Sequence, residues 1–257
     1  MIRVTALGHY FAPLEDDALL PPLQAALKEA GRGQYRRIDR FVELALLGAG
    51  RCAAGRKLAP DCGLYLGSGL GPMGDNVRVQ QQLVLERFVP MPFNFINILG
   101  SNAGFYVAKD LGLSGQNYFV SRRGASFEAA LELAVMDLEL GVVRQALVGV
   151  VEDVSLPLAE HRLRQGLAPG TRLAEGSHWL LLETSAEEGC KLEYTRHPDA
   201  VSLQLALSTF PEVERRGAPT GPFHDSLTGA WVTERLRAGA PQGLIVTAGT
   251  GLFHFRP

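Results

Sequence analysis

The feature that most constrains the fold lies between residues 117 and 151. Asn117 to Ser121 has the pattern of a β-strand, Phe127 to Leu140 that of an amphipathic helix, and Ala146 to Val151 that of a buried strand. A strand, a helix and a second strand in such close succession make a βαβ unit, whose two strands run parallel. The sequence therefore predicts an α/β protein with helices packed on a largely parallel sheet.

Composition excludes several other classes of protein. The chain has 257 residues, of which 46% are apolar and 20% charged, with a net charge of −2, so no basic excess is present to bind nucleic acid. Cys52, Cys62 and Cys190 form no CxxC pair, which argues against a disulfide framework or a zinc ribbon and favours the reducing cytoplasm. No apolar run approaches the roughly 18 residues of a membrane span, and none has the form of a signal peptide.

The pattern elsewhere predicts one complete α/β layer followed by a shorter C-terminal part. Asp39 and Asp75 are suitable N-caps for helices, and Gly8 with Pro13 is expected to end the first strand. The linker Glu187-Glu-Gly189 suggests a division into residues 1–186 and 187–257. Further helices are expected over 22–30, 40–54, 76–88, 101–111, 199–208 and 225–238, and further strands over 2–7, 62–66, 179–183, 244–247 and 252–255.

A glycine-rich turn at Gly69–Gly74 matches G-x-G-x-x-G between a predicted strand and a predicted helix, as in dinucleotide-binding proteins. Pro72 removes one N–H from the turn. A dinucleotide site also needs a carboxylate at the end of the second strand, about 20 residues later, but Glu86 lies within a predicted helix. A nucleotide-binding domain using Gly69–Gly74 is therefore the weaker alternative. The favoured interpretation is a sharp turn that packs closely over the sheet.

The tight turn between the strand at 117–121 and the following helix is where α/β enzymes place a nucleophile. Its sequence, Phe119-Val-Ser-Arg-Arg-Gly-Ala-Ser-Phe-Glu-Ala-Ala-Leu131, resembles the β-ketoacyl synthases of the thiolase superfamily, whose turn carries a cysteine in a Thr-Ala-Cys-Ser-Ser motif. Further segments with the family's order and spacing are Arg37–Phe41, Leu64–Gly71, Pro92–Asn102, Leu111–Gly115 and Gln145–Val150. The resemblance spans roughly residues 1–8 and 36–185, and it implies a thiolase-like N-terminal half with a mixed, mostly parallel sheet and a truncated C-terminal half.

The chain departs from this family at the reacting groups. Gly124 occupies the position of the nucleophilic cysteine, and a residue without a side chain cannot form an acyl thioester. The family's His-Gly-Thr-Gly-Thr motif is missing, and His224 only loosely resembles its second histidine. Displaced thioester chemistry by a stand-alone enzyme, using Ser126 or His224, remains an alternative, although each is also well explained as a residue at the start of a helix. The three cysteines are expected to be apolar fillers.

A family member that keeps the scaffold and loses the nucleophile resembles the chain-length-factor subunits of type II polyketide systems, bacterial aryl polyene synthesis among them. The resemblance implies a heterodimer with an active ketosynthase, indirect contact with an acyl carrier protein, and no cofactor or metal. Interface residues implied by it are Gln116, Asn117, Tyr118, Phe119, Val120 and Ser121. Candidates for the wall of an acyl tunnel are Phe93, Phe95, Phe105 and Tyr118. Arg122, Arg123 and Gly124 form a degenerate version of the family's turn. The two arginines are expected to fill the former acyl site, to pair with carboxylates of a partner chain, or to lie in solvent.

Overall fold

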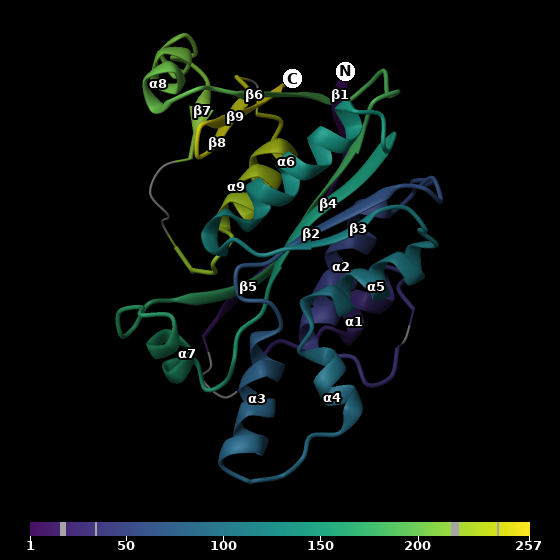
Figure 1. Cartoon of the computed structure of the whole chain (residues 1–257), viewed down its shortest axis with the longest axis vertical. Helices are drawn as coiled ribbons and strands as arrows, with labels where there is room; N and C mark the ends of the chain where they lie inside the picture. The colour runs from purple at the N-terminus through teal and green to yellow at the C-terminus, as the bar shows by residue number, and fades with distance from the viewer. Residues whose placement is uncertain (16–18, 34, 217–220, 241) are drawn as a thin grey trace.

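A single mixed sheet organises the chain in the computed structural model, which describes residues 1–15, 19–33, 35–216, 221–240 and 242–257 (Figure 1). The strand order is β3-β2-β4-β5-β1-β6-β9-β8-β7. The strands are β1 (Ile2–Leu14), β2 (Gly63–Gly67), β3 (Asn117–Val120), β4 (Gln145–Glu152), β5 (Leu173–Glu183), β6 (Cys190–Arg196), β7 (Glu214–Arg215), β8 (Leu244–Ala248) and β9 (Gly251–Arg256). The helices are α1 (Gln24–Glu29), α2 (Arg40–Ala53), α3 (Met73–Val84), α4 (Pro92–Asn97), α5 (Gly100–Leu111), α6 (Ser126–Glu139), α7 (Leu158–Arg164), α8 (Ala200–Ser208) and α9 (Leu227–Arg237).

The sheet is mixed and flanked by helices, as predicted, but the expectation that it is mostly parallel is wrong. Parallel pairing is confined to β3-β2-β4 and β7-β8, whereas β4-β5, β5-β1, β1-β6, β6-β9 and β9-β8 are antiparallel. The difference arises from β1, which continues through Gly8 to Leu14 and pairs with the whole of β5. Gly8 does not end the strand. A Cβ at this position would collide with the carbonyl oxygen of Gly48, so glycine is needed where α2 crosses β1.

Helices cover both faces of the sheet. On one face α2 and α5 pack over β1, β2, β4 and β5, and on the other α6 and α9 do so (Figure 1). The Asp39 side chain caps α2 as predicted, accepting a hydrogen bond of 2.8 Å from the Val42 N–H. Phe127, Leu131 and Val135 of α6 are fully buried against the sheet. The predicted βαβ unit is confirmed, with β2 lying between its two strands.

The last third of the chain extends the same sheet. β6 pairs with β1 at Ile2–Val4, and β9, β8 and β7 continue outward from it. Residues 187–189 form the turn between β5 and β6, so Cys190 begins a strand rather than lying in a linker. None of the described helices has the length and hydropathy needed to cross a membrane.

Three local predictions are corrected by the helix boundaries. α3 begins at Met73, so Asp75 lies inside the helix instead of capping it. The helix expected over 225–238 begins at Leu227, after Ser226. Between the helices expected over 76–88 and 101–111 lies a further helix, α4, which begins at Pro92 because proline at the first position of a helix supplies the right φ and loses no hydrogen bond.

Candidate functional site at the turn after β3

The turn from β3 into α6 is tight and is closed by its own backbone. Arg123 adopts a left-handed conformation with φ of 53°, which L-residues other than glycine rarely take. The Ser126 hydroxyl donates to the carbonyl of Arg123 at 2.7 Å and accepts from the N–H of Arg122 at 2.8 Å. Because its one proton is committed to a carbonyl within the turn and the side chain is fully buried, Ser126 is not placed to act as a nucleophile.

Gly124 is exposed at the centre of this turn. A Cβ placed on it would lie 3.3 Å from the carbonyl oxygen of Asp225, the nearest atom. The two arginines beside it differ. Arg123 donates to the Gln165 Oε1 at 3.0 Å and lies 3.6 Å from the Asp225 carboxylate, whereas Arg122 is exposed. Arg123 therefore ties the turn to the segments before α9 and after α7.

We expect the turn to be chemically inert toward thioesters, because position 124 has no side chain and the Ser126 hydroxyl is engaged. Incubation with acyl-carrier-protein or acyl-CoA thioesters should leave the mass of the intact protein unchanged, while an active ketosynthase in the same assay becomes acylated. A stable acyl adduct on any residue from 121 to 127 would overturn this expectation.

His224 lies in a buried row of three imidazoles that sequence reasoning did not find. The His178 Nδ1 lies 3.1 Å from the His9 Nδ1, and the His178 Nε2 lies 3.3 Å from the His224 Nε2. The Thr233 hydroxyl lies 2.9 Å from the His9 Nδ1 and also within hydrogen-bond distance of backbone carbonyls of α9. The direction of each hydrogen bond in the row is set by the tautomers of the rings, and the His224 Nδ1 has no hydrogen-bond partner among the described residues.

Burial keeps this row uncharged near neutral pH. Burial lowers the pKa of His224 to about 3 and lowers that of His178 well below its usual value, with the neighbouring imidazoles adding to the effect on His178. An imidazole with so low a pKa is a poor general base, which weakens the alternative of displaced chemistry at His224. No signal in the sequence indicates the row, since its members come from β1, β5 and the segment before α9.

The glycine-rich turn after β2 is occupied by the protein's own acceptors. Glu152, at the end of β4, accepts from the Gly69 N–H at 2.6 Å. Asp153 accepts from the N–H groups of Met73 and Gly74 at 2.9 and 3.2 Å, and the Ser68 hydroxyl accepts from the Gly71 N–H at 2.8 Å. These carboxylates take the donors that a phosphate would use. Two consecutive acidic residues, the last residue of the buried strand β4 and the one after it, are the signal that could have revealed this network.

Because these donors are engaged, we expect NAD, NADP and ATP not to bind at Gly69–Gly74. Thermal unfolding at millimolar ligand should show no saturable stabilisation, with a known nucleotide-binding enzyme as the positive control. Saturable stabilisation by any of the three nucleotides would restore the alternative of a nucleotide-binding domain.

Glu152 makes the stability of this turn dependent on pH. Burial raises its pKa to about 7, even though Gly69, Ser68 and Ser226 donate to it. The stability that Glu152 contributes is therefore fully present below its unfolded-state pKa of about 4.5. It is lost as the pH rises through the folded-state pKa of about 7.

The substitution Glu152→Gln should remove this loss, because an amide accepts from Gly69 and donates to the Ser68 hydroxyl without becoming charged. Between pH 4 and pH 8 the free energy of unfolding of the variant should rise relative to wild type by about 3 kcal/mol. Urea unfolding at a series of pH values measures it, with Glu86→Gln on the surface as the control. Parallel pH profiles for Glu152→Gln and wild type would contradict the assignment.

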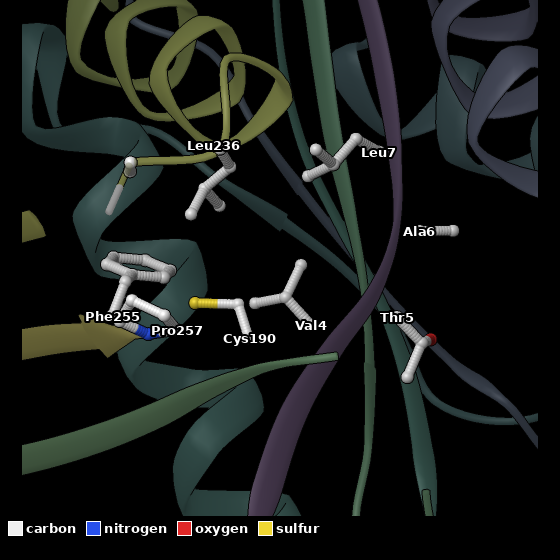
Figure 2. A pocket seen from close by; sticks show the side chains of 10 residues that line it. Val4, Thr5, Ala6, Leu7, Cys190, Leu236, Phe255 and Pro257 are labelled. Carbon is white, nitrogen blue, oxygen red and sulfur yellow. The ribbon is translucent and has the colours of Figure 1, made fainter. Parts of the chain in front are cut away.

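Two of the three cysteines are buried in the core, as expected, and the third lies beside a cavity. Cys52 and Cys62 are fully buried, and burial raises the pKa of both thiols, that of Cys62 to about 12. The Cys190 sulfur instead points into a small apolar cavity of about 180 Å³ between Val4, Leu236 and Phe255 (Figure 2). Burial raises the pKa of this thiol to about 11, so it is protonated at neutral pH and weakly nucleophilic.

The residues expected to line a tunnel lie at the surface of this chain. Phe95, Phe105 and Tyr118 are exposed, and Phe93 is half-buried beneath the Arg37 guanidinium. None of them lines the cavity at Cys190 or a second one, of about 390 Å³, beside Glu128. The strand β3 is at the edge of the sheet, with Gln116, Asn117, Tyr118 and Ser121 exposed and Phe119 and Val120 partly buried.

Comparison with known proteins identifies the fold. No protein-family model and no curated protein matches the sequence. Among solved structures, a chain of "The ishigamide ketosynthase/chain length factor" superposes with a TM-score of 0.68 at 15% identity, covering 99% of this chain and 98% of that one. A chain of the ketosynthase ApeO in complex with its chain length factor ApeC, from Xenorhabdus doucetiae, gives 0.62 at 16%, with 100% and 99% covered.

A β-ketoacyl synthase from Burkholderia phymatum STM815 is equally similar, with a TM-score of 0.63 at 15% identity and 100% and 99% of the two chains covered. The superposition therefore covers almost the whole length of all three of these chains. The chain has the thiolase-like fold of the solved ketosynthase and chain-length-factor structures, as the sequence resemblance implies.

Proposed function

We propose that this protein is the non-catalytic subunit of a heterodimer with an active ketosynthase, and that it shapes the tunnel for the growing acyl chain. It would act in polyketide or fatty-acid-like biosynthesis in the cytoplasm, with aryl polyene synthesis as the system we favour. An acyl carrier protein would meet it indirectly, by delivering substrate to the ketosynthase. The observation that carries the proposal is a large uncovered apolar surface continuous with the edge strand β3.

That surface, here named the 83–118 surface, contains eleven of the twenty exposed large apolar side chains among the described residues. They are Leu83, Val84, Leu85, Phe88, Val89, Met91, Phe95, Ile96, Leu99, Phe105 and Tyr118. Between residues 79 and 108 the only charged residues are Glu86 and Arg87. Soluble monomers rarely expose an apolar area of this extent, so a protein partner is its natural cover.

The elements that carry these side chains pack in series. α3 contacts α4, α4 contacts α5, and α5 contacts β3. In Figure 1 α3 and α4 extend away from the sheet, on the same side as α5. The edge of β3 adds unpaired backbone N–H and C=O groups, which a second chain can satisfy by extending the sheet. In the family that the sequence resembles, the corresponding strand pairs antiparallel with its counterpart across the dimer axis.

Two further observations support an active ketosynthase as the partner. Gly124 lacks the nucleophile, so condensation requires a cysteine from another chain. One of the similar structures is a ketosynthase in complex with its chain length factor, which is an assembly of this kind. The aromatic tunnel candidates Phe95, Phe105 and Tyr118 are exposed in the isolated chain, and a tunnel that includes them would be completed by the partner.

The proposal is tested by reconstitution. The protein should be co-expressed with candidate active ketosynthases, and condensation assayed for the chain alone, the wild-type complex and a complex whose ketosynthase has lost its nucleophilic cysteine. We expect turnover only from the wild-type complex. Turnover by the chain alone would refute the non-catalytic role, and full activity of the ketosynthase without this chain would refute the need for a subunit.

A further inference from the structure

The second cavity, of about 390 Å³, lies between the beginnings of α6 and α9 and the strands β7 and β8. Its volume is in the range of roughly 300–1,000 Å³ that is usual for small-molecule sites. It is lined by Glu128, Leu207, Arg215, Arg216, Thr228, Ile245, Val246 and Thr247. None of these residues belongs to the 83–118 surface or to the turn at Gly124, and the inference drawn from the cavity does not rest on the proposed function.

Arg216 brings a cation to this cavity without an anion to pair with it. The residue is half-buried, and its guanidinium donates from Nη1 to the Thr228 hydroxyl at 2.6 Å. Among the described residues no carboxylate lies within 4 Å of it. A guanidinium has five N–H donors in a planar fork, so most of the donors of Arg216 are left for a ligand or for water.

A second arginine shows what Arg216 lacks. Arg40 is also half-buried, but it donates to both carboxylate oxygens of Glu175. Burial lowers the pKa of the Arg216 guanidinium. At Arg40 burial acts in the same direction, but Glu175 outweighs it and the pKa is raised. A carboxylate in the cavity would do for Arg216 what Glu175 does for Arg40.

The lining of the cavity carries a net positive charge. Arg215, on β7, is a second arginine of the lining, and it too forms no ion pair with a carboxylate of the described residues. Glu128 is the one acidic residue among the lining residues, so the two guanidinium groups outnumber it whether it is ionised or protonated. A cleft lined by an excess of one charge attracts ligands of the opposite charge, here an anion.

The remaining wall is aliphatic. Leu207 and Ile245 belong to one apolar cluster and Val246 to another, and all three line the cavity. We propose that this cavity binds a small organic monocarboxylate with a short alkyl chain, its carboxylate on the Arg216 guanidinium and its chain against Leu207, Ile245 and Val246. An inorganic anion would pair with Arg216 but leave the aliphatic wall and most of the volume uncovered.

The test uses hexanoate as the probe and the full chain, with binding measured by calorimetry and by thermal shift at constant ionic strength. Two analogues divide the ligand: acetate lacks the alkyl chain and 1-hexanol lacks the charge. We expect saturable binding of hexanoate. Each analogue should bind at least about tenfold more weakly, because acetate buries no chain against the aliphatic wall and 1-hexanol leaves the Arg216 cation unpaired.

Arg216→Gln should weaken hexanoate binding by at least about tenfold, while Arg256→Gln, at an exposed arginine outside the cavity, leaves it unchanged. Circular dichroism checks that both variants fold, and the analogues on the wild-type chain decide the matter if Arg216→Gln is unstable. The proposal is overturned if hexanoate fails to bind at millimolar concentration, if acetate or 1-hexanol binds as tightly, or if Arg216→Gln binds hexanoate like wild type. None of these outcomes affects the ketosynthase pairing, which is measured separately.

Discussion

Phe95→Asp and Phe105→Asp should each abolish co-purification of this protein with its ketosynthase. Both side chains are more than half exposed, and they lie on neighbouring helices of the 83–118 surface. Buried at an interface, each aspartate would place an unpaired charge against apolar side chains, which costs at least about 2 kcal/mol. The dissociation constant should therefore rise by at least about 30-fold for each variant.

Controls come from apolar residues that are exposed on other elements. Leu163 on α7 is 80% exposed and Val201 on α8 is 78% exposed, so Leu163→Asp and Val201→Asp introduce the same charge outside the 83–118 surface. These variants should bind the ketosynthase like wild type. If all four variants bind equally well, the contact lies elsewhere on the chain.

The structure also decides which substitution in β3 is informative. The Phe119 ring packs against Phe41, with ring centroids 6.5 Å apart, and fills the space beside Gly100. Phe119→Pro would therefore disturb the core as well as the edge of the sheet, and loss of binding would have two explanations. Substitutions at exposed Phe95 and Phe105 avoid this ambiguity.

The largest expected effect on stability is at Arg40. Glu175 on β5 is fully buried, and Arg40 at the start of α2 donates to both of its carboxylate oxygens, from Nε at 2.7 Å to Oε2 and from Nη2 to Oε1. Arg40 also donates to the carbonyl of Pro21 at 2.7 Å. Arg40→Met leaves a buried carboxylate uncompensated and should lower the free energy of unfolding by about 3–5 kcal/mol.

A double-mutant cycle separates this charge effect from lost packing. Adding Glu175→Gln to Arg40→Met should recover most of the stability, because the amide is neutral. The exposed pair formed by Arg164 and Glu160 on α7 is the control, and Arg164→Met should cost less than about 1 kcal/mol. Urea unfolding measures all the variants. A double variant as unstable as Arg40→Met would show that packing, not charge, holds Arg40 in place.

This pair also explains part of the sequence pattern. The segment Arg37–Phe41 was one of the resemblances to ketosynthases, and three of its residues have separate physical roles. Asp39 caps α2, Arg40 neutralises Glu175, and Phe41 is buried in the core. Periodicity alone predicted α2 and α6 well, because both carry one apolar face and a clear end signal.

Other features could not be predicted from local patterns. Gly8 indicated the end of a strand, yet it is the point where α2 approaches β1 most closely, which depends on the tertiary structure. The imidazole row joins residues separated by 169 and 46 positions, so only the completed sheet brings them together. The sequence does not predict the exposure of the 83–118 surface, because an apolar pattern is the same whether the side chains face the core or a partner.

Native mass spectrometry of the co-expressed pair, combined with hydrogen exchange, tests the central claim most directly. The account predicts a one-to-one complex with the ketosynthase, and protection of amides in α4, α5 and β3 that is absent from the chain alone. It also predicts little change in α7 and α8. A chain that remains monomeric beside its ketosynthase, or a complex that leaves α4, α5 and β3 unprotected, would contradict it.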